Sequence, residues 1–208
     1  MTKTAKIFVV DDDADVRESL GQLLDTAGYA VEAYESAQAF LAGARIPQRG
    51  CLLVDLRMPG MNGLELQQQL VADGIRLPVI IITGHADVPL AVQAMKAGAS
   101  DFIEKPYDFT TIVNAVKTAL SSAVPAQGMT PAVPDEIGRR LAQLTARERD
   151  VLEQLVVGHP NKVIALNLSI SPRTVEIHRA RVMEKMAASS LSHLVRMALA
   201  AGIGPRTP

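Results

Sequence analysis

Short apolar runs alternate with amphipathic stretches through the first 121 residues of the chain. The runs expected to form strands are Ile7–Val10, Tyr29–Tyr34, Cys51–Val54, Val79–Ile82 and Asp101–Ile103. The stretches expected to form helices are Ala14–Ala27, Ser36–Ala42, Gly63–Asp73, Pro89–Ala97 and Asp108–Ser121. Because parallel strands need crossover connections, strands that alternate with helices predict an α/β fold with a doubly wound, five-stranded parallel sheet.

The second half of the chain shows helical periodicity alone. Thr145 and Glu148 have the spacing of a capping box, which predicts the start of a helix. Asn161 is expected to cap the next one. The helices expected after the first are Lys162–Leu168, Ser171–Met186 and Ser190–Ala201. Two short helices joined by a tight turn predict a smaller all-α domain that contains a helix-turn-helix.

Between these two patterns lies a stretch with the composition of a linker. Ser122–Pro134 holds three prolines, one glycine and no charged residue. Prolines favour extended backbone, and such a segment has little apolar surface to bury. We therefore divide the chain into a first domain over residues 1–121, a linker over 122–137 and a second domain over 138–208.

Charge and cysteine content indicate the kind of partner and the cellular compartment of the protein. The net charge of −1 combines an acidic first part, −5 over residues 1–121, with a basic second part, +4 over residues 122–208, which suggests a polyanionic partner for the second domain. The single cysteine, Cys51, excludes a disulfide framework and suits a reducing compartment. No apolar run is long enough to span a bilayer, and the first residues lack a signal-peptide pattern. We expect a cytoplasmic protein that has no membrane partner.

Charged and hydroxyl side chains follow the expected strands, where the carboxyl ends of a parallel sheet collect ligands. Asp11–Asp13 follow the first strand, Asp55 the third and Thr83 the fourth, and Lys105 follows the fifth. Clustered carboxylates stay ionised when they share a divalent cation, and an oxygen-only ligand set favours Mg²⁺, with Mn²⁺ as an alternative. A nearby lysine and threonine suit phosphoryl oxygens, so Asp55 is a candidate nucleophile rather than a plain strand-ending residue.

Four motifs in this order resemble the receiver domain of two-component response regulators. They are VVDDD at 9–13, VDLRMPGMNG at 54–63, ITGH at 82–85 and DFIEKP at 101–106. Residues 83–107 are similar to the FixJ branch in particular. The resemblance implies a flavodoxin-like fold and a sensor histidine kinase that phosphorylates Asp55.

The same resemblance implies a role for each residue around Asp55. Mg²⁺ would be held by Asp11, Asp12, Asp55 and the backbone carbonyl of Arg57. Thr83 and Lys105 would contact the phosphoryl oxygens, with a cis peptide bond between Lys105 and Pro106. Phe102 would be an aromatic gate that swings inward when Thr83 is drawn toward the phosphoryl group. Arg57 and His85 occupy positions where family members vary the lifetime of the acyl phosphate.

Residues 144–186 resemble the LuxR-type helix-turn-helix that FixJ proteins carry. The resemblance implies that Ser171–Met186 is the recognition helix in the major groove of double-stranded DNA, with Val175, Val182 and Met186 facing the core. The candidate DNA contacts are Lys162, Arg173, Thr174, Glu176, Ile177, His178, Arg179 and Arg181. A regulator of this kind dimerises on phosphorylation, in part through its last helix, and acts on RNA polymerase.

Other interpretations of the carboxylates differ in what they predict. An EF-hand starting at Asp11 fails, because Val16 replaces its turn glycine and Gln22 its closing glutamate. A Mg²⁺-dependent aspartyl-phosphate phosphatase shares the Asp11-x-Asp13 pattern, although no later strand supplies its second acidic pair. A phospho-switched protein-interaction module would be phosphorylated on Asp55 but would not bind DNA. The favoured hypothesis is a transcription regulator that takes part only in its own phosphoryl transfer and dephosphorylation.

Overall fold

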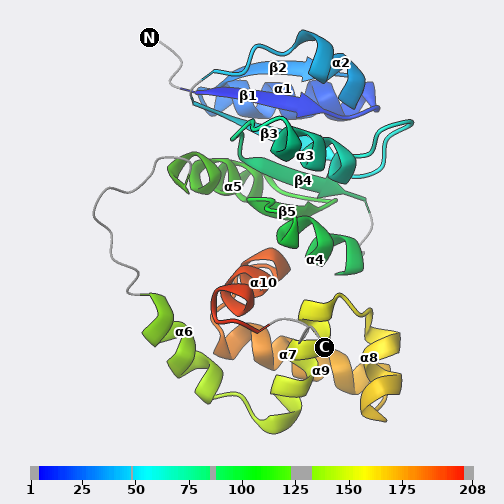
Figure 1. The fold of residues 1–208 in the computed structure, drawn as a ribbon, viewed down its shortest axis with the longest axis vertical. Coiled ribbons are helices and arrows are strands. Elements are labelled where there is room, and N and C mark those ends of the chain that lie inside the picture. Colours follow the sequence, from blue (N-terminus) through cyan, green and yellow to red (C-terminus); the bar gives the residue numbers. More distant parts are fainter. Residues whose placement is uncertain (1–4, 48, 85–87, 123–132, 204–208) are drawn as a thin grey trace. The chain divides into compact units, whose positions relative to one another are not determined.

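A computed structural model describes residues 5–47, 49–84, 88–122 and 133–203 (Figure 1). The chain divides into two compact units. The first unit comprises residues 1–86 and 97–126, and the second comprises residues 87–96 and 127–208. The helix α4, Val88–Lys96, groups with the second unit, although by connectivity it is the crossover between the last two strands of the sheet.

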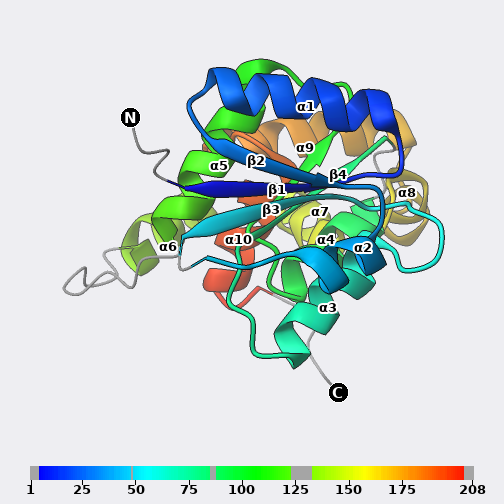
Figure 2. The same ribbon diagram turned by 90° about the horizontal axis from the view of Figure 1, so that it is seen from above.

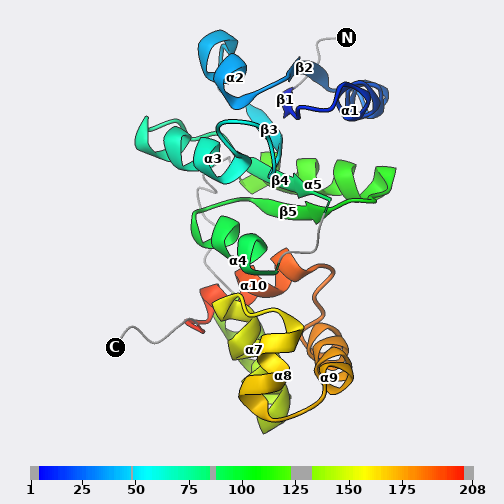
Figure 3. The ribbon, with the colours of Figure 1, turned by 90° about the vertical axis from the view of Figure 1, so that its right-hand side faces the viewer.

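The first unit contains a five-stranded parallel sheet with the strand order β2-β1-β3-β4-β5. Its strands are β1 (Lys6–Val10), β2 (Ala30–Tyr34), β3 (Gly50–Asp55), β4 (Val79–Thr83) and β5 (Asp101–Glu104). Its helices are α1 (Ala14–Thr26), α2 (Ala37–Gly43), α3 (Gly63–Ala72) and α5 (Phe109–Ser122). The helices α1 and α5 cover one face of the sheet, and α2 and α3 cover the other (Figures 2 and 3). The predicted sheet is therefore confirmed, strand by strand.

Strand residues alternate between two apolar layers, because neighbouring side chains on a strand point to opposite faces. One layer joins Ile7, Leu53 and Ile82 to apolar residues of α1 and α5, such as Leu24 and Val116. All six residues of β3 are buried, which explains why this strand is an uninterrupted apolar run in the sequence. A central strand covered on both faces holds its terminal residue, Asp55, in a fixed position.

The second unit is helical, as predicted. Besides α4, its helices are α6 (Val133–Ala142), α7 (Ala146–Val157), α8 (Asn161–Leu168), α9 (Pro172–Lys185) and α10 (Leu191–Ala200). The helix α7 packs against α8, α9 and α10, and α8 packs against α9. Val175, Val182 and Met186 are fully buried, which confirms that they face the core. No helix among the described residues is long and apolar enough to cross a membrane.

Two sequence predictions need correction in this unit. The helix α6 starts at Val133, so residues 133–137 are helical rather than part of an extended linker. A proline near a helix start is compatible with α6, since the first turn needs no backbone donor there. The residue before α8 is Pro160, and Asn161 is the first helical residue instead of the N-cap. The predicted capping box of Thr145 and Glu148 is confirmed, and Ser36 and Ser171 cap α2 and α9.

Candidate functional site

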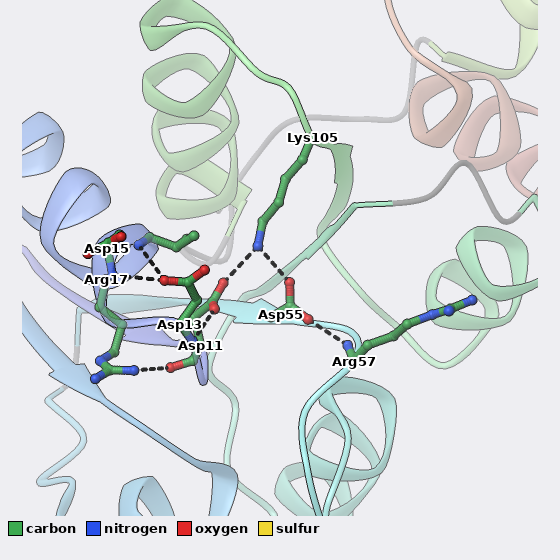
Figure 4. Close-up of polar contacts among 8 residues, drawn as sticks. Asp11, Asp13, Asp15, Arg17, Asp55, Arg57 and Lys105 are labelled. Atoms are coloured by element: carbon green, nitrogen blue, oxygen red, sulfur yellow. Dashed lines mark hydrogen bonds and ion pairs between the residues drawn. The ribbon is translucent and has the colours of Figure 1, made fainter.

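The carboxyl ends of β1 and β3 bring Asp11 and Asp55 together. Val10 and Val54 are paired in the sheet, so the residues that follow them lie side by side. The Lys105 Nζ donates to Asp11 Oδ2 at 2.9 Å and to Asp55 Oδ1 at 2.8 Å (Figure 4). Both carboxylates are buried, with 2% and 7% of Asp11 and Asp55 exposed. Three residues predicted to share a site thus form one ionic cluster, here named the Asp11–Asp55–Lys105 cluster.

Burial and pairing act against each other in this cluster. Burial raises the pKa of Asp11 above its ordinary value, although its hydrogen bond to Lys105 acts in the opposite direction. Burial acts to lower the pKa of Lys105, but its hydrogen bonds to Asp55 and Asp11 outweigh that effect and raise the pKa to about 12. The ammonium therefore stays charged at neutral pH, whereas two buried carboxylates compete for it.

Backbone contacts fix the loops that carry these carboxylates. The Arg57 N–H donates to Asp55 Oδ2 at 2.6 Å, and the Asp13 N–H donates to Asp11 Oδ1 at 3.0 Å. Asp13 also caps α1 by accepting from Asp15 N, as expected of a helix N-cap rather than a metal ligand. Each carboxylate is therefore oriented by its own loop.

Arg17 is a residue of this region that the sequence did not single out. Its Nη1 donates to the backbone carbonyl oxygen of Asp11 at 2.7 Å (Figure 4). This bond fixes the peptide unit that joins Asp11 to Asp12. The only signal in the sequence is the position of an arginine one turn into α1, which by itself predicts a solvated side chain.

The loop from β3 to α3 depends on a close approach that only glycine permits. A Cβ atom on Gly63 would lie 2.4 Å from the carbonyl oxygen of Asp55, well inside van der Waals contact. Asn62 completes a capping box with Glu65 at the same helix start. The start of α3 is therefore held directly against the backbone of Asp55.

The carboxylates at this edge of the sheet supply some of the oxygen ligands that a hard divalent cation needs. Asp11 and Asp55 already converge on one cation, the ammonium of Lys105, and oxygen is the donor type that Mg²⁺ prefers. Asp12 is exposed at the same loop. Among the described residues, no three acidic, histidine or cysteine side chains are gathered as a metal centre. The predicted set of Asp11, Asp12 and Asp55 is therefore present at one edge, although the three do not converge.

The remaining predicted residues of this edge come from β4 and β5. Thr83 ends β4 and is 1% exposed, and its carbonyl oxygen accepts from Lys105 N at 2.7 Å. The Lys105–Pro106 peptide bond is cis, as the resemblance implied. Phe102 is buried, with 8% of it exposed, and its inward swing stays a prediction. His85, proposed to affect acyl phosphate lifetime, lies outside the described residues.

In the second unit, α8 and α9 form the predicted helix-turn-helix. Ser169 ends α8 in the left-handed region, with φ 54°, and Ser171 caps α9 by accepting from Thr174 N. Glu148 and Lys185 fasten α9 to α7: Lys185 Nζ donates to Glu148 Oε2 at 2.6 Å. Lys185 and the backbone N–H of Thr145 lower the pKa of Glu148 to about 2. The helix α9 is thus fixed at both ends.

The predicted DNA contacts fall into two groups. Those with exposed side chains are Lys162, Arg173, Glu176, Ile177 and Arg181. The other three are partly buried. Thr174 shares a hydrogen bond with Ser171, and Arg179 donates to Asn161. The Nδ1 atom of His178 is buried, and no hydrogen-bond partner for it lies in the described part of the chain.

Family models match both units. The model described as response regulator receiver domain matches residues 7–117, and the one described as bacterial regulatory proteins, luxR family, matches residues 142–198. The first match spans β1 to α5, including the segment of α4. The second runs from the last residue of α6 to α10 and includes the helix-turn-helix.

Individual relatives match over nearly the whole chain. The transcriptional regulatory protein FixJ of Azorhizobium caulinodans is 52% identical over 205 residues, covering 99% of this chain and 97% of that protein. The response regulator TodT of Pseudomonas putida is 40% identical over 195 residues, covering 94% and 86%. Among solved structures, full-length FixJ from B. japonicum has a TM-score of 0.56 and 47% identity, covering 97% of this chain and 99% of that one. StyR follows, with a TM-score of 0.55 and 40% identity over 94% and 98%.

Proposed function

The chain belongs to the two-component response regulators that join a receiver domain to a LuxR-type DNA-binding domain, and from this premise we propose that Asp55 is its phosphoacceptor. As a transcriptional response regulator, it receives its signal from a sensor kinase and acts by binding DNA. The observation that supports Asp55 is the Asp11–Asp55–Lys105 cluster at the carboxyl ends of the central strands. Of its two carboxylates, only Asp55 is the last residue of the central strand β3, whereas Asp11 follows the end of β1.

In the proposed step, a carboxylate oxygen of Asp55 attacks the phosphorus atom of a phosphohistidine on the kinase. The P–N bond breaks, the histidine leaves, and an acyl phosphate forms on Asp55. Lys105, whose pKa is raised to about 12, remains cationic and can stabilise the negative charge on the phosphoryl oxygens. Thr83, buried at the end of the adjacent strand, would supply a hydroxyl to the same oxygens.

Asp11, Asp12 and Asp55, with the backbone carbonyl of Arg57, are the groups we propose to hold Mg²⁺, with Mn²⁺ as a substitute. The cation would neutralise charge that builds up between the carboxylates and the phosphoryl group. Asp11 supports this assignment, because burial raises its pKa while it shares the Lys105 ammonium with Asp55. An additional cation would relieve the remaining negative charge.

We propose that the second unit carries out the response to phosphorylation. Phosphorylation would shift Thr83 and Phe102 between two states and favour a homodimer. A dimer would place two α9 helices on half-sites about 34–36 Å apart. Lys162, Arg173, Glu176, Ile177 and Arg181 are exposed for contact with the major groove and phosphates. The bound dimer would act on RNA polymerase in the cytoplasm.

The test uses the full chain with acetyl phosphate and Mg²⁺. Intact mass, size-exclusion chromatography and duplex binding at several salt concentrations are measured for the wild type and for Asp55→Asn. Asp73→Asn is the matched control, since Asp73 is an exposed carboxylate at the end of α3 that accepts from Gln69. We expect one added phosphoryl group in the wild type and the control, and none in Asp55→Asn. An adduct on Asp55→Asn would overturn the assignment.

The same measurements separate the other two functions. Turnover of an external phosphoester without a stable adduct would favour the phosphatase. A stable adduct with no salt-dependent duplex binding would favour the protein-interaction module, because contact with DNA phosphates releases counterions.

A further inference from the structure

Arg179 lies in the middle of the recognition helix but donates a hydrogen bond within the protein. Its Nη1 atom lies 2.7 Å from Asn161 Oδ1. Asn161 is the first residue of α8, and the residue before it, Pro160, offers no side-chain cap to that helix. The bond thus joins α9 to the start of α8, where Pro160 makes no side-chain capping bond.

The position of Arg179 on α9 separates it from the exposed face of the helix. The exposed residues of α9 beyond its first residue are Arg173, Glu176, Ile177, Ala180, Arg181 and Glu184. With 3.6 residues per turn, these positions form one stripe along the helix. Arg179 follows Val175 by four residues and precedes Val182 by three, and both of these valines are fully buried. Arg179 therefore lies beside the core-facing side of α9.

We infer that Arg179 is a positioning residue for DNA recognition and not a DNA contact. Through Asn161 it sets the angle between α8 and α9, and this angle decides how the exposed stripe meets the major groove. A planar guanidinium suits this task, because its donors are fixed in one plane and lose little freedom on binding. The inference rests on the DNA binding of this family and assigns Arg179 a role different from that of Arg173 and Arg181.

The experiment compares Arg179→Ala, Asn161→Ala and the double variant in the full phosphorylated chain. The probe is a duplex recovered from a random pool by the wild-type protein. Affinity is measured over a series of salt concentrations, and the folded fraction of each variant is determined by hydrogen exchange. Arg173→Ala and Arg181→Ala serve as matched controls, since both remove an exposed arginine from the same helix.

We expect Arg179→Ala and Asn161→Ala each to weaken binding by roughly tenfold, the loss associated with one charge-assisted hydrogen bond. The double variant should bind no more weakly than either single one, because both changes break the same bond. The slope of log affinity against log salt should stay at the wild-type value. The two controls should each reduce that slope by about 1.

Three outcomes would overturn the inference. The first is a reduced salt slope in Arg179→Ala, which would mark a phosphate contact. The second is additive losses from the two single variants. The third is wild-type affinity of the folded fraction, which would mean that the bond serves stability alone. Failure of the wild type to select any duplex would instead count against DNA binding itself.

Discussion

Both units of the chain bury a carboxylate against a lysine, but the two arrangements differ in charge balance. Glu148 is 2% exposed and accepts from Lys185 at 2.6 Å and from Thr145 N at 2.8 Å, which lowers its pKa to about 2. At the sheet edge, one ammonium serves two buried carboxylates, and the pKa of Asp11 is raised. The pair in the helical unit is neutral and complete, whereas the cluster in the sheet keeps an excess negative charge.

This difference separates a structural ion pair from one that we propose to be reactive. The Glu148–Lys185 pair carries no excess charge and also accepts from the backbone of Thr145, so it joins α7 to α9 without attracting a further cation. A cluster with one negative charge too many favours the arrival of another cation. A carboxylate and a lysine therefore stabilise the fold in one unit, and in the other they form the site proposed for phosphorylation.

The largest effect is expected from removing the lysine of the complete pair. Lys185→Met leaves Glu148 buried without its cation, and we expect the free energy of unfolding of the helical unit to fall by roughly 3 kcal/mol. Hydrogen exchange of α7 and α9 peptides measures this loss. A single carboxylate is a poor site for Mg²⁺, so excess Mg²⁺ should not restore the lost stability. Recovery of stability with Mg²⁺ would contradict the comparison.

The matched change at the sheet edge is Lys105→Met. We expect a smaller loss of roughly 2 kcal/mol in metal-free buffer, because the raised pKa of Asp11 makes protonation of the cluster easier. Mg²⁺ should restore part of it by binding the folded state. Tyrosine fluorescence in denaturant titrations measures the first unit alone, since all three tyrosines lie before residue 121. Equal stability with and without Mg²⁺ would argue against a cation site.

The two carboxylates should also give opposite pH dependence. The pKa of Glu148 is lowered to about 2, so its contribution is complete above its ordinary value of 4.5 and is lost as the pH falls toward 2. The pKa of Asp11 is raised above 3.8, so its contribution is present below that value and is lost as the pH rises through the raised pKa.

Each carboxylate changes stability by at most about 1.4 kcal/mol per pH unit. Unfolding across this pH range, with EDTA present, measures both effects. Glu148→Gln should remove the pH dependence of the second unit alone. Asp11→Asn should remove that of the first unit alone. A variant that changed both units would show that the two dependences have another source.

The smallest effect concerns the backbone of the helix-turn-helix. In the described part of the first unit, left-handed positions are glycines, such as Gly60, whereas Ser169 and Ala187 are left-handed without being glycine in the second. Ser169→Gly should raise the free energy of unfolding by about 0.5–1 kcal/mol, because glycine adopts this conformation at no steric cost. Denaturation followed by circular dichroism measures the gain, and Ser189→Gly, outside the left-handed region, is the control.

Much of this fold could be predicted because its determinants are local in sequence. The buried run ending in Asp55 indicated a central strand, and the capping box at Thr145 and Glu148 indicated a helix start; the structure has both. Convergence of Asp11, Asp55 and Lys105 followed from topology, since the carboxyl ends of parallel strands meet at one edge. The exceptions are α6, hidden in a proline-containing stretch, and the start of α8 at Asn161.

What the sequence could not determine is which partner each polar side chain has. Asp11, Asp55 and Lys105 were predicted to meet, but the sequence did not show that one ammonium would bridge both carboxylates. Arg17, Arg179 and Lys185 looked alike as helical cations, yet one holds the Asp11 carbonyl, one holds Asn161 and one neutralises Glu148. Periodicity decides which face of a helix is buried, whereas partners distant along the chain depend on how helices and strands pack. The sequence thus determined the fold and the residues of the proposed phosphorylation site, and only the tertiary structure decided which charges are balanced.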